Sequence, residues 1–152
     1  LHANSANQAL DRIINFFPEE KRQQVLMDLS LNIKGLISQR LIPRQTGVRR
    51  IAAMEVMLQS PLISDLIFKG EVTRIKEIMA KSTRIGMQTF DQDLFQLYEN
   101  GKISYEEAIR NADSKNELRL RIKLESKRDK PTAVDDSGGL QVMEEQEKAR
   151  RY

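Results

Sequence analysis

Helix-start signals recur through residues 59–125, and they constrain the fold of this chain more than any other feature of its sequence. Each signal places a Ser or Thr directly before an expected helix, where its side-chain oxygen can accept a hydrogen bond from a main-chain amide. The four signals are Ser60-Pro61, Thr89-x-x-Gln92, Ser104-x-x-Glu107 and Ser114-x-x-Glu117. Gly70, Gly86 and Gly101 stand where the helices between them would end. The sequence therefore predicts a cluster of short helices.

The last of these helices carries a second, conflicting pattern. Apolar and basic residues alternate from Leu118 to Leu124, which is the periodicity of a strand. The capping box that starts at Ser114, and the good helix formers after it, favour a helix. We expect a helix here, and a strand is the alternative.

Two longer helices are expected at the start of the chain. One apolar stripe runs from Ala6 to Phe17 at helical spacing, and Pro18 ends it. Pro18 can also occupy the first position of a second helix. The second stripe runs from Val25 to Ile37, so we expect that helix to end before Pro43.

A strand pair is expected next. Arg50 to Leu58 is nearly all apolar, which suits a strand covered on both faces. Its expected partner is Ser38–Ile42, joined to it through the turn residues 45–47. Glu55 interrupts the apolar run, and we expect the strand to turn toward a cleft or solvent there, with no catalytic role.

The end of the chain loses these patterns. Residues 126–152 contain few apolar side chains, with as many acidic as basic residues, and we expect a flexible tail outside the core. A length of 152 residues suits one domain. The residues alone thus predict a mainly α fold with a short β-hairpin or strand pair.

Charge and composition narrow the function. The chain has 25 Lys and Arg against 22 Asp and Glu, a balance too even to indicate nucleic-acid binding. Basic residues without acids do gather between Lys34 and Arg50, either as an anion-binding or subunit-contact edge or as a solvated strand edge, and we favour the solvated edge. No apolar run reaches the roughly 18 residues that span a membrane. We therefore expect neither nucleic-acid binding nor membrane insertion.

Few residues could carry catalysis. The chain has no cysteine, and His2 is its only histidine, so no metal site is expected. No G-x-x-x-x-G-K-[ST] phosphate loop is present, and the seven glycines are scattered. A self-contained nucleotide hydrolase is therefore not expected.

Several segments, taken in order, resemble the type IV pilus retraction ATPases of the PilT/PilU family. Leu1–Ala6, Asp11–Ile13 and Phe17-Pro18 resemble the histidine box and the helices after it. Ser38–Leu41 resembles the following strand, and Gly86–Asp91 resembles a late signature. The resemblance extends from the start of the chain to about residue 124.

Within this family the PilU type is more similar than the PilT type. The sequence L-I-S-D-L-I at residues 62–67 agrees with the PilT-type motif A-I-R-N-L-I only at its second, fifth and sixth positions. The tail after residue 124 is also longer than in a PilT-type chain.

The resemblance implies a part of a larger fold. Family members are hexameric rings of two-lobed subunits whose C-terminal lobe is RecA-like, with a phosphate loop and a Walker B acid before the histidine box. This chain, which starts without Met, would be the downstream part of that α/β lobe. Residues 1–58 would end the RecA-like ATPase core, residues 59–125 would form a C-terminal helical cluster, and residues 126–152 would be the tail.

The resemblance also implies site residues and cofactors. His2 would be the catalytic and nucleotide-binding residue, near the γ-phosphate, and would link the nucleotide state to domain motion. Arg12 is a second candidate for nucleotide contact, with a plain salt bridge as the alternative. ATP and magnesium would act in the intact parent, an ATP hydrolase, and neither is expected on this chain alone, which would be inactive.

Partners and location follow from the same resemblance. The partners would be the chain's own N-terminal lobe, neighbouring subunits of a homohexamer and the pilus platform protein, with a paralogous retraction motor as a further candidate. The location would be cytoplasmic, at the inner membrane. An alternative function is a helical interaction module, in which residues 60–124 dock subunits or partners.

Overall fold

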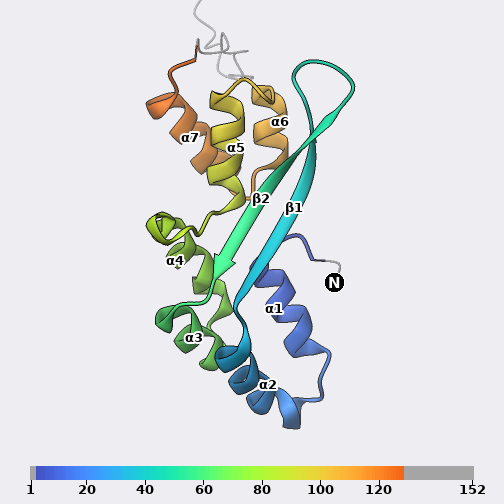
Figure 1. The fold of residues 1–152 in the computed structure, drawn as a ribbon, viewed down its shortest axis with the longest axis vertical. Helices are drawn as coiled ribbons and strands as arrows, with labels where there is room; N and C mark the ends of the chain where they lie inside the picture. The colour runs from blue at the N-terminus through green and yellow to red at the C-terminus, as the bar shows by residue number, and fades with distance from the viewer. Residues whose placement is uncertain (1–2, 129–152) are drawn as a thin grey trace, which may run out of the picture.

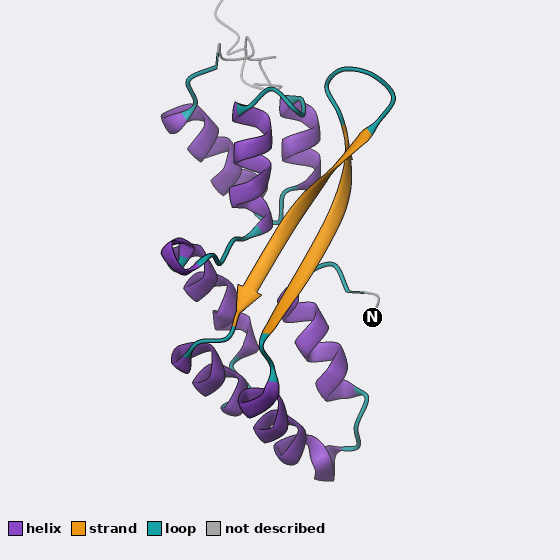
Figure 2. Ribbon diagram, viewed as in Figure 1, coloured by secondary structure: helices purple, strands orange, loops and turns teal. Residues whose placement is uncertain are grey.

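A long twisted β-hairpin runs through the molecule, with helices packed at both of its ends (Figures 1 and 2). The computed structural model describes residues 3–128. In chain order the elements are α1 (Ala6–Asn15), α2 (Glu19–Asn32), β1 (Gly35–Pro43), β2 (Arg50–Leu58), α3 (Pro61–Phe68), η1 (Val72–Arg74), α4 (Ile75–Lys81), η2 (Thr83–Ile85), α5 (Phe90–Glu99), α6 (Tyr105–Asn111) and α7 (Lys115–Glu125). The predicted mainly helical fold with one strand pair is confirmed.

The two strands pair antiparallel along their whole length. The register runs from Gly35 opposite Leu58 to Pro43 opposite Arg50. The other edge of β2 is occupied by an isolated bridge, in which Val56 and Gln88 exchange two main-chain hydrogen bonds of 2.8 and 2.9 Å. Within residues 3–128, no strand pairs with the outer edge of β1.

The prediction that the second helix continues through Ile37 is wrong. Helix α2 ends at Asn32, Ile33 is already extended with ψ 130°, and Ile37 lies in β1. Gly35 disfavours a longer helix, because glycine costs about 1 kcal/mol in a helix interior, and the residues from Gly35 on pair with β2 instead. In the hairpin, a Cβ at Gly35 would stand 2.8 Å from the carbonyl oxygen of Met57, so strand pairing brings the two main chains into close approach.

Two apolar clusters divide the core, and the hairpin contributes to both. The lower cluster joins α1, α3 and α4 to β2; its buried residues are Ala6, Leu10, Met57, Ile63, Leu66, Ile67, Val72, Ile75, Met79 and Met87. The upper cluster joins Ile42 and Ala53 of the hairpin to α5, α6 and α7. On β2, Ala53, Glu55 and Met57 are buried and the alternate residues are half-buried. We expected β2 to be covered on both faces. Its face with Ala53, Glu55 and Met57 is buried, and its other face is only half-buried.

Most predicted caps are present. Ser60 and Ser104 accept from the amides of Ile63 and Glu107 at 3.3 and 3.2 Å. Thr89 and Gln92 form the complete capping box. The box predicted at Ser114 is wrong, because that side chain makes no cap hydrogen bond. Residues 115–125 are nevertheless helical, so the helix expected there is confirmed and the strand alternative is excluded.

The first residues assigned to the tail contact the upper helices. The amide of Lys127 donates to Glu99 Oε1 at 2.7 Å. The guanidinium of Arg128 lies 4.6 Å from the ring centroid of Tyr98 and donates to Gln45 Oε1 at 3.1 Å. Residues 129–152 lie outside the described part of the chain.

Candidate functional site

The two residues expected to contact nucleotide are not brought together in the described part of the chain. His2 lies outside the described residues. Arg12 lies on α1 with its side chain exposed, and within residues 3–128 its guanidinium group forms neither a hydrogen bond nor an ion pair. The structure therefore leaves both predicted roles untested.

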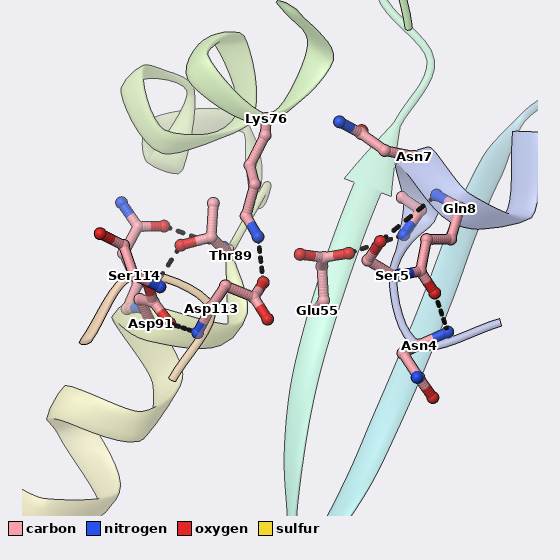
Figure 3. A network of polar contacts seen from close by, with 12 residues as sticks. Asn4, Ser5, Asn7, Gln8, Glu55, Lys76, Thr89, Asp91, Asp113 and Ser114 are labelled. Carbon is pink, nitrogen blue, oxygen red and sulfur yellow. Dashed lines mark hydrogen bonds and ion pairs between the residues drawn. The ribbon is translucent and has the colours of Figure 1, made fainter. Parts of the chain in front are cut away.

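The residues directly after His2 do enter a buried polar network (Figure 3). Glu55 of β2 is 1% exposed, and its Oε1 accepts the amide hydrogen of Ala6 at 2.7 Å. Ser5 caps α1 by accepting from the amide of Gln8 at 3.3 Å. A carboxylate at this position also complements the positive end of the helix dipole. The start of α1 is thus held by a side chain 49 residues later in the sequence.

Glu55 does not turn toward solvent, and that expectation is wrong. Figure 3 shows its carboxyl group between the start of α1 on one side and Lys76 with Asp113 on the other. Its Oε2 is buried and has no hydrogen-bond partner among residues 3–128. Burial raises the pKa of Glu55, and the Ala6 amide and the charge of Lys76 oppose this shift only in part. Burial of the charged carboxylate therefore costs folding free energy, and the contacts with Ala6 and Lys76 offset this cost only in part.

Arg40, which lies on β1, contacts three separate segments of the chain. Its guanidinium donates to the carbonyl oxygens of Asn4 at 3.0 Å and Asn111 at 2.7 Å. It also donates to Asp113 Oδ1 at 2.7 Å. The same group lies 4.0 Å from the ring centroid of Phe90, a cation–π contact. The planar fork of arginine suits such a shared position.

Asp113 is itself fixed from two sides. It accepts from Lys76 as well as from Arg40. The carboxylate of Asp91, in the first turn of α5, accepts the amides of Asp113 and Ser114 at 2.7 and 2.9 Å. The amide of Ser114 thus has its partner in Asp91. The loop between α6 and α7 is therefore tied to both α5 and the hairpin.

A second attachment joins α5 to the edge of β2. Asp93 Oδ2 accepts the amide of Met54 at 2.7 Å, and Gln88 Nε2 donates to the Met54 carbonyl oxygen at 3.0 Å. Burial raises the pKa of Asp93, against the hydrogen bond from Met54. These contacts fix the upper helices on the strand.

The contacts of this network hold main-chain segments in place. Its carboxylates accept main-chain amides or pair with cations, and within residues 3–128 no group of three or more acidic or histidine side chains is placed to hold a metal ion. Nor is any helix in that range long and apolar enough to cross a membrane.

The sequence indicated these residues only indirectly. Arg40 belonged to the basic segment that we favoured as a solvated edge, and its ion pair with Asp113 joins residues 73 positions apart. Glu55 stood out as a charge in an apolar run, but we expected it to turn toward a cleft or solvent and not to bind a buried main-chain amide. No sequence pattern pointed to the amide of Ala6.

The chain is similar to pilus ATPases over most of its length. It is 51% identical to the type IV pilus ATPase PilU of Pseudomonas aeruginosa, and the match covers 100% of this chain and 40% of PilU. It is 37% identical to the type IV pilus retraction ATPase PilT of the same organism, over 74% of this chain and 32% of PilT. A twitching motility protein of Neisseria gonorrhoeae is 32% identical over 78% of this chain and 32% of that protein. No protein-family model matches.

The fold of this chain is also similar to solved structures of ATPases. The crystal structure of the pilus retraction motor PilT with bound ADP superposes with a TM-score of 0.70 at 32% identity, over 79% of this chain and 33% of that one. The ATPase DotB of Legionella pneumophila has a TM-score of 0.58 at 24% identity, a likeness of fold alone. The chain spans 40% or less of the length of these curated relatives. By sequence and by fold together, the chain belongs to the family of type IV pilus retraction ATPases that includes PilU and PilT.

Proposed function

We propose that this chain is the downstream part of a motor ATPase that powers type IV pilus retraction by ATP hydrolysis. The observation that carries the proposal is the 51% identity to PilU along the whole chain. The match to PilT with bound ADP supports a nucleotide-dependent parent. The lower identity to PilT than to PilU favours a PilU-type motor.

Exposed apolar surface on the hairpin supports a larger parent fold. The outer edge of β1 is unpaired within the described residues, and Ile37 and Leu41 of this strand are 69% and 55% exposed. An open strand edge with apolar side chains is a place where another strand pairs. A groove of about 690 Å³ between α1 and α2 adds to this surface; its apolar lining residues are Ile13, Phe17, Val25, Leu29, Ile33 and Leu36. In the proposal, the upstream part of the same RecA-like lobe covers both.

This sequence has no phosphate loop, so in the proposal the catalytic groups are divided between this chain and the upstream part of the subunit. Phosphoryl transfer needs a cradle for the β- and γ-phosphates and magnesium, and this sequence supplies neither a cradle nor a Walker motif. In the proposal these groups lie upstream, His2 approaches the γ-phosphate and Arg12 contacts the nucleotide. ATP and magnesium are the cofactors of the complete subunit, and this chain alone is inactive.

Assembly and location belong to the same proposal. Complete subunits form a hexameric ring in the cytoplasm against the inner membrane, where the ring acts on the pilus platform protein. A paralogous retraction motor is a further partner. Residues 1–58 complete the ATPase core, and residues 59–125 form the outer helical cluster.

The proposal is tested by ATP hydrolysis of the complete subunit, meaning the subunit that carries this chain together with the upstream lobe. With magnesium, His2→Ala is expected to lower kcat by roughly a hundredfold, the typical loss when one transition-state donor is removed. Arg12→Ala is expected to raise KM for ATP several-fold. The matched control is Arg22→Ala, an exposed arginine of α2, which should change neither constant. Full turnover after His2→Ala would overturn the assigned role of His2.

The second candidate function is a helical interaction module. The observation in its favour is a surface groove of about 430 Å³ between α2 and α3, beside the exposed side chains of Met27, Leu31 and Phe68. The oligomeric state of this chain in solution separates the two functions. Stable assembly of this chain into a defined ring or dimer favours the module, and a need for the upstream lobe favours the motor part.

A further inference from the structure

We propose that Arg40 and Glu55 are positioning residues, which hold the main chain at Asn4–Ala6 against the hairpin and thereby fix how the preceding His2 is presented to nucleotide. The inference rests on the proposed function, because it assigns a control element to the same histidine. In this proposal the two strands of the hairpin hold the segment Asn4–Ala6 in position.

The contact at Glu55 meets a need that the helix cannot meet itself. Ala6 is the first residue of α1, and the first amides of a helix have no acceptor within it. Glu55 Oε1 accepts this amide at 2.7 Å in a buried setting. Without the carboxyl oxygen, a buried donor would be left unpaired, which a protein rarely tolerates.

Arg40 fixes the same segment two residues earlier, at Asn4. Its Nη2 donates to the carbonyl oxygen of Asn4 at 3.0 Å and to Asp113 Oδ1 at 2.7 Å. Its Nη1 donates to the carbonyl oxygen of Asn111 at 2.7 Å. One planar group therefore binds the N-terminal segment and the end of α6 together. Lysine carries its donors on a single nitrogen and cannot reproduce this fork.

The two contacts come from adjacent strands and act on residues two positions apart. Arg40 holds Asn4 from β1, and Glu55 holds Ala6 from β2. A segment fixed at two points has one arrangement, whereas a segment fixed at one point can pivot. If only a fraction of molecules holds the histidine correctly, activity falls by that fraction. The expected defect is thus in kcat, since the upstream phosphate loop still binds ATP.

Asp113 extends this attachment to the helical cluster. It pairs with both Arg40 and Lys76, and Asp91 holds its amide. The N-terminal segment and the loop between α6 and α7 therefore share one arginine. A change in either segment must be accommodated by the other.

The test uses the complete subunit and four variants. Arg40→Lys keeps the charge and removes the fork, and Glu55→Ala removes the acceptor. Glu55→Gln keeps an oxygen acceptor without the charge. Arg44→Lys is the matched control, because Arg44 is exposed directly after β1 and its side chain has no partner within residues 3–128. The readouts are kcat and KM for ATP, together with hydrogen exchange of the amides at residues 4–6, all taken well below the melting temperature of each variant.

We expect Arg40→Lys and Glu55→Ala to lower kcat roughly tenfold, the effect of losing one charge-assisted hydrogen bond. KM for ATP should stay within about twofold, and exchange at residues 4–6 should rise at least about tenfold. Glu55→Gln and Arg44→Lys should resemble the unchanged protein in all three readouts. Rescue by glutamine separates a hydrogen-bond acceptor from a buried charge.

Different results overturn different claims. If the unchanged subunit does not turn over ATP, the proposed motor function fails, and the exchange data alone still decide whether the segment is held. If turnover is normal but Arg40→Lys and Glu55→Ala leave kcat or exchange unchanged, the positioning role is overturned. Equal losses in Glu55→Gln and Glu55→Ala would overturn the acceptor role of Glu55.

Discussion

At the scale of single residues, the molecule is organised by two charged side chains on neighbouring strands. Arg40 and Glu55 lie between the two apolar clusters and bind segments far away in the sequence. The two side chains differ in how well their polar groups are satisfied. Arg40 donates to three acceptors and lies over the ring of Phe90, whereas Glu55 has one oxygen without a partner among residues 3–128. A charge buried in this way makes stability depend on pH.

The raised pKa of Glu55 gives that dependence a sign. The folded chain holds the proton more tightly than the unfolded chain, in which the ordinary value is 4.5. This contribution to stability is fully present below about pH 4.5 and is lost as the pH rises through the raised pKa. The melting temperature of Glu55→Gln, measured from pH 4 to 8, should therefore rise relative to the unchanged protein as pH increases. A difference that stays constant, as we expect for Arg44→Lys, would contradict this.

Local chemistry made some of these residues predictable and hid others. A glutamate in the apolar run of β2 indicated a special position, but its partner is the amide of Ala6, and an amide has no sequence signature. Arg40 looked like one of several surface arginines. Its three acceptors come from residues 4, 111 and 113, which only the tertiary fold brings together.

At the scale of elements, helix starts depend on nearby residues and helix ends depend on tertiary contacts. Ser60, Thr89 and Ser104 cap the helices that the sequence assigned to them, because a cap needs only the next three residues. The end of α2 was misplaced, because the stripe through Ile37 fits both a helix and a strand until β2 pairs with it. The predicted Ser114 cap is not formed, and Asp91 instead accepts hydrogen bonds from the main-chain amides of that loop.

Two caps with similar sequence patterns should therefore differ in energy. Thr89→Ala removes a complete capping box and should lower the free energy of unfolding by about 1 kcal/mol. Ser114→Ala removes a hydroxyl that makes no cap hydrogen bond, and should change it by less than about 0.5 kcal/mol. Denaturant unfolding of both variants measures the difference. Similar losses would show that Ser114 does cap α7 in solution.

At the scale of the whole molecule, the described residues leave apolar surface uncovered. The outer edge of β1 and the groove between α1 and α2 lie on the side that the proposal assigns to the upstream lobe. The family resemblance implied only that residues 1–58 end a larger α/β lobe, which is consistent with an uncovered face. The extent of the surface could not be predicted, since it depends on which face of β1 the helices cover.

The uncovered surface should have a measurable effect. This chain by itself is expected to bind an apolar dye or to self-associate. Ile37→Lys together with Leu41→Lys, two exposed positions on β1, should reduce both. A chain that is monomeric, melts cooperatively and does not bind the dye would contradict the proposal that a missing lobe covers this face.

The central claim is that this chain contributes to a motor whose phosphate-binding groups lie upstream. The most direct test is ATP binding and turnover with magnesium by residues 1–152 alone, with the complete subunit as the positive control. The account predicts turnover by the complete subunit, and neither binding nor turnover by the chain alone. Turnover by the chain alone that is lost on His2→Ala would contradict it, because the active site would then lie within these residues.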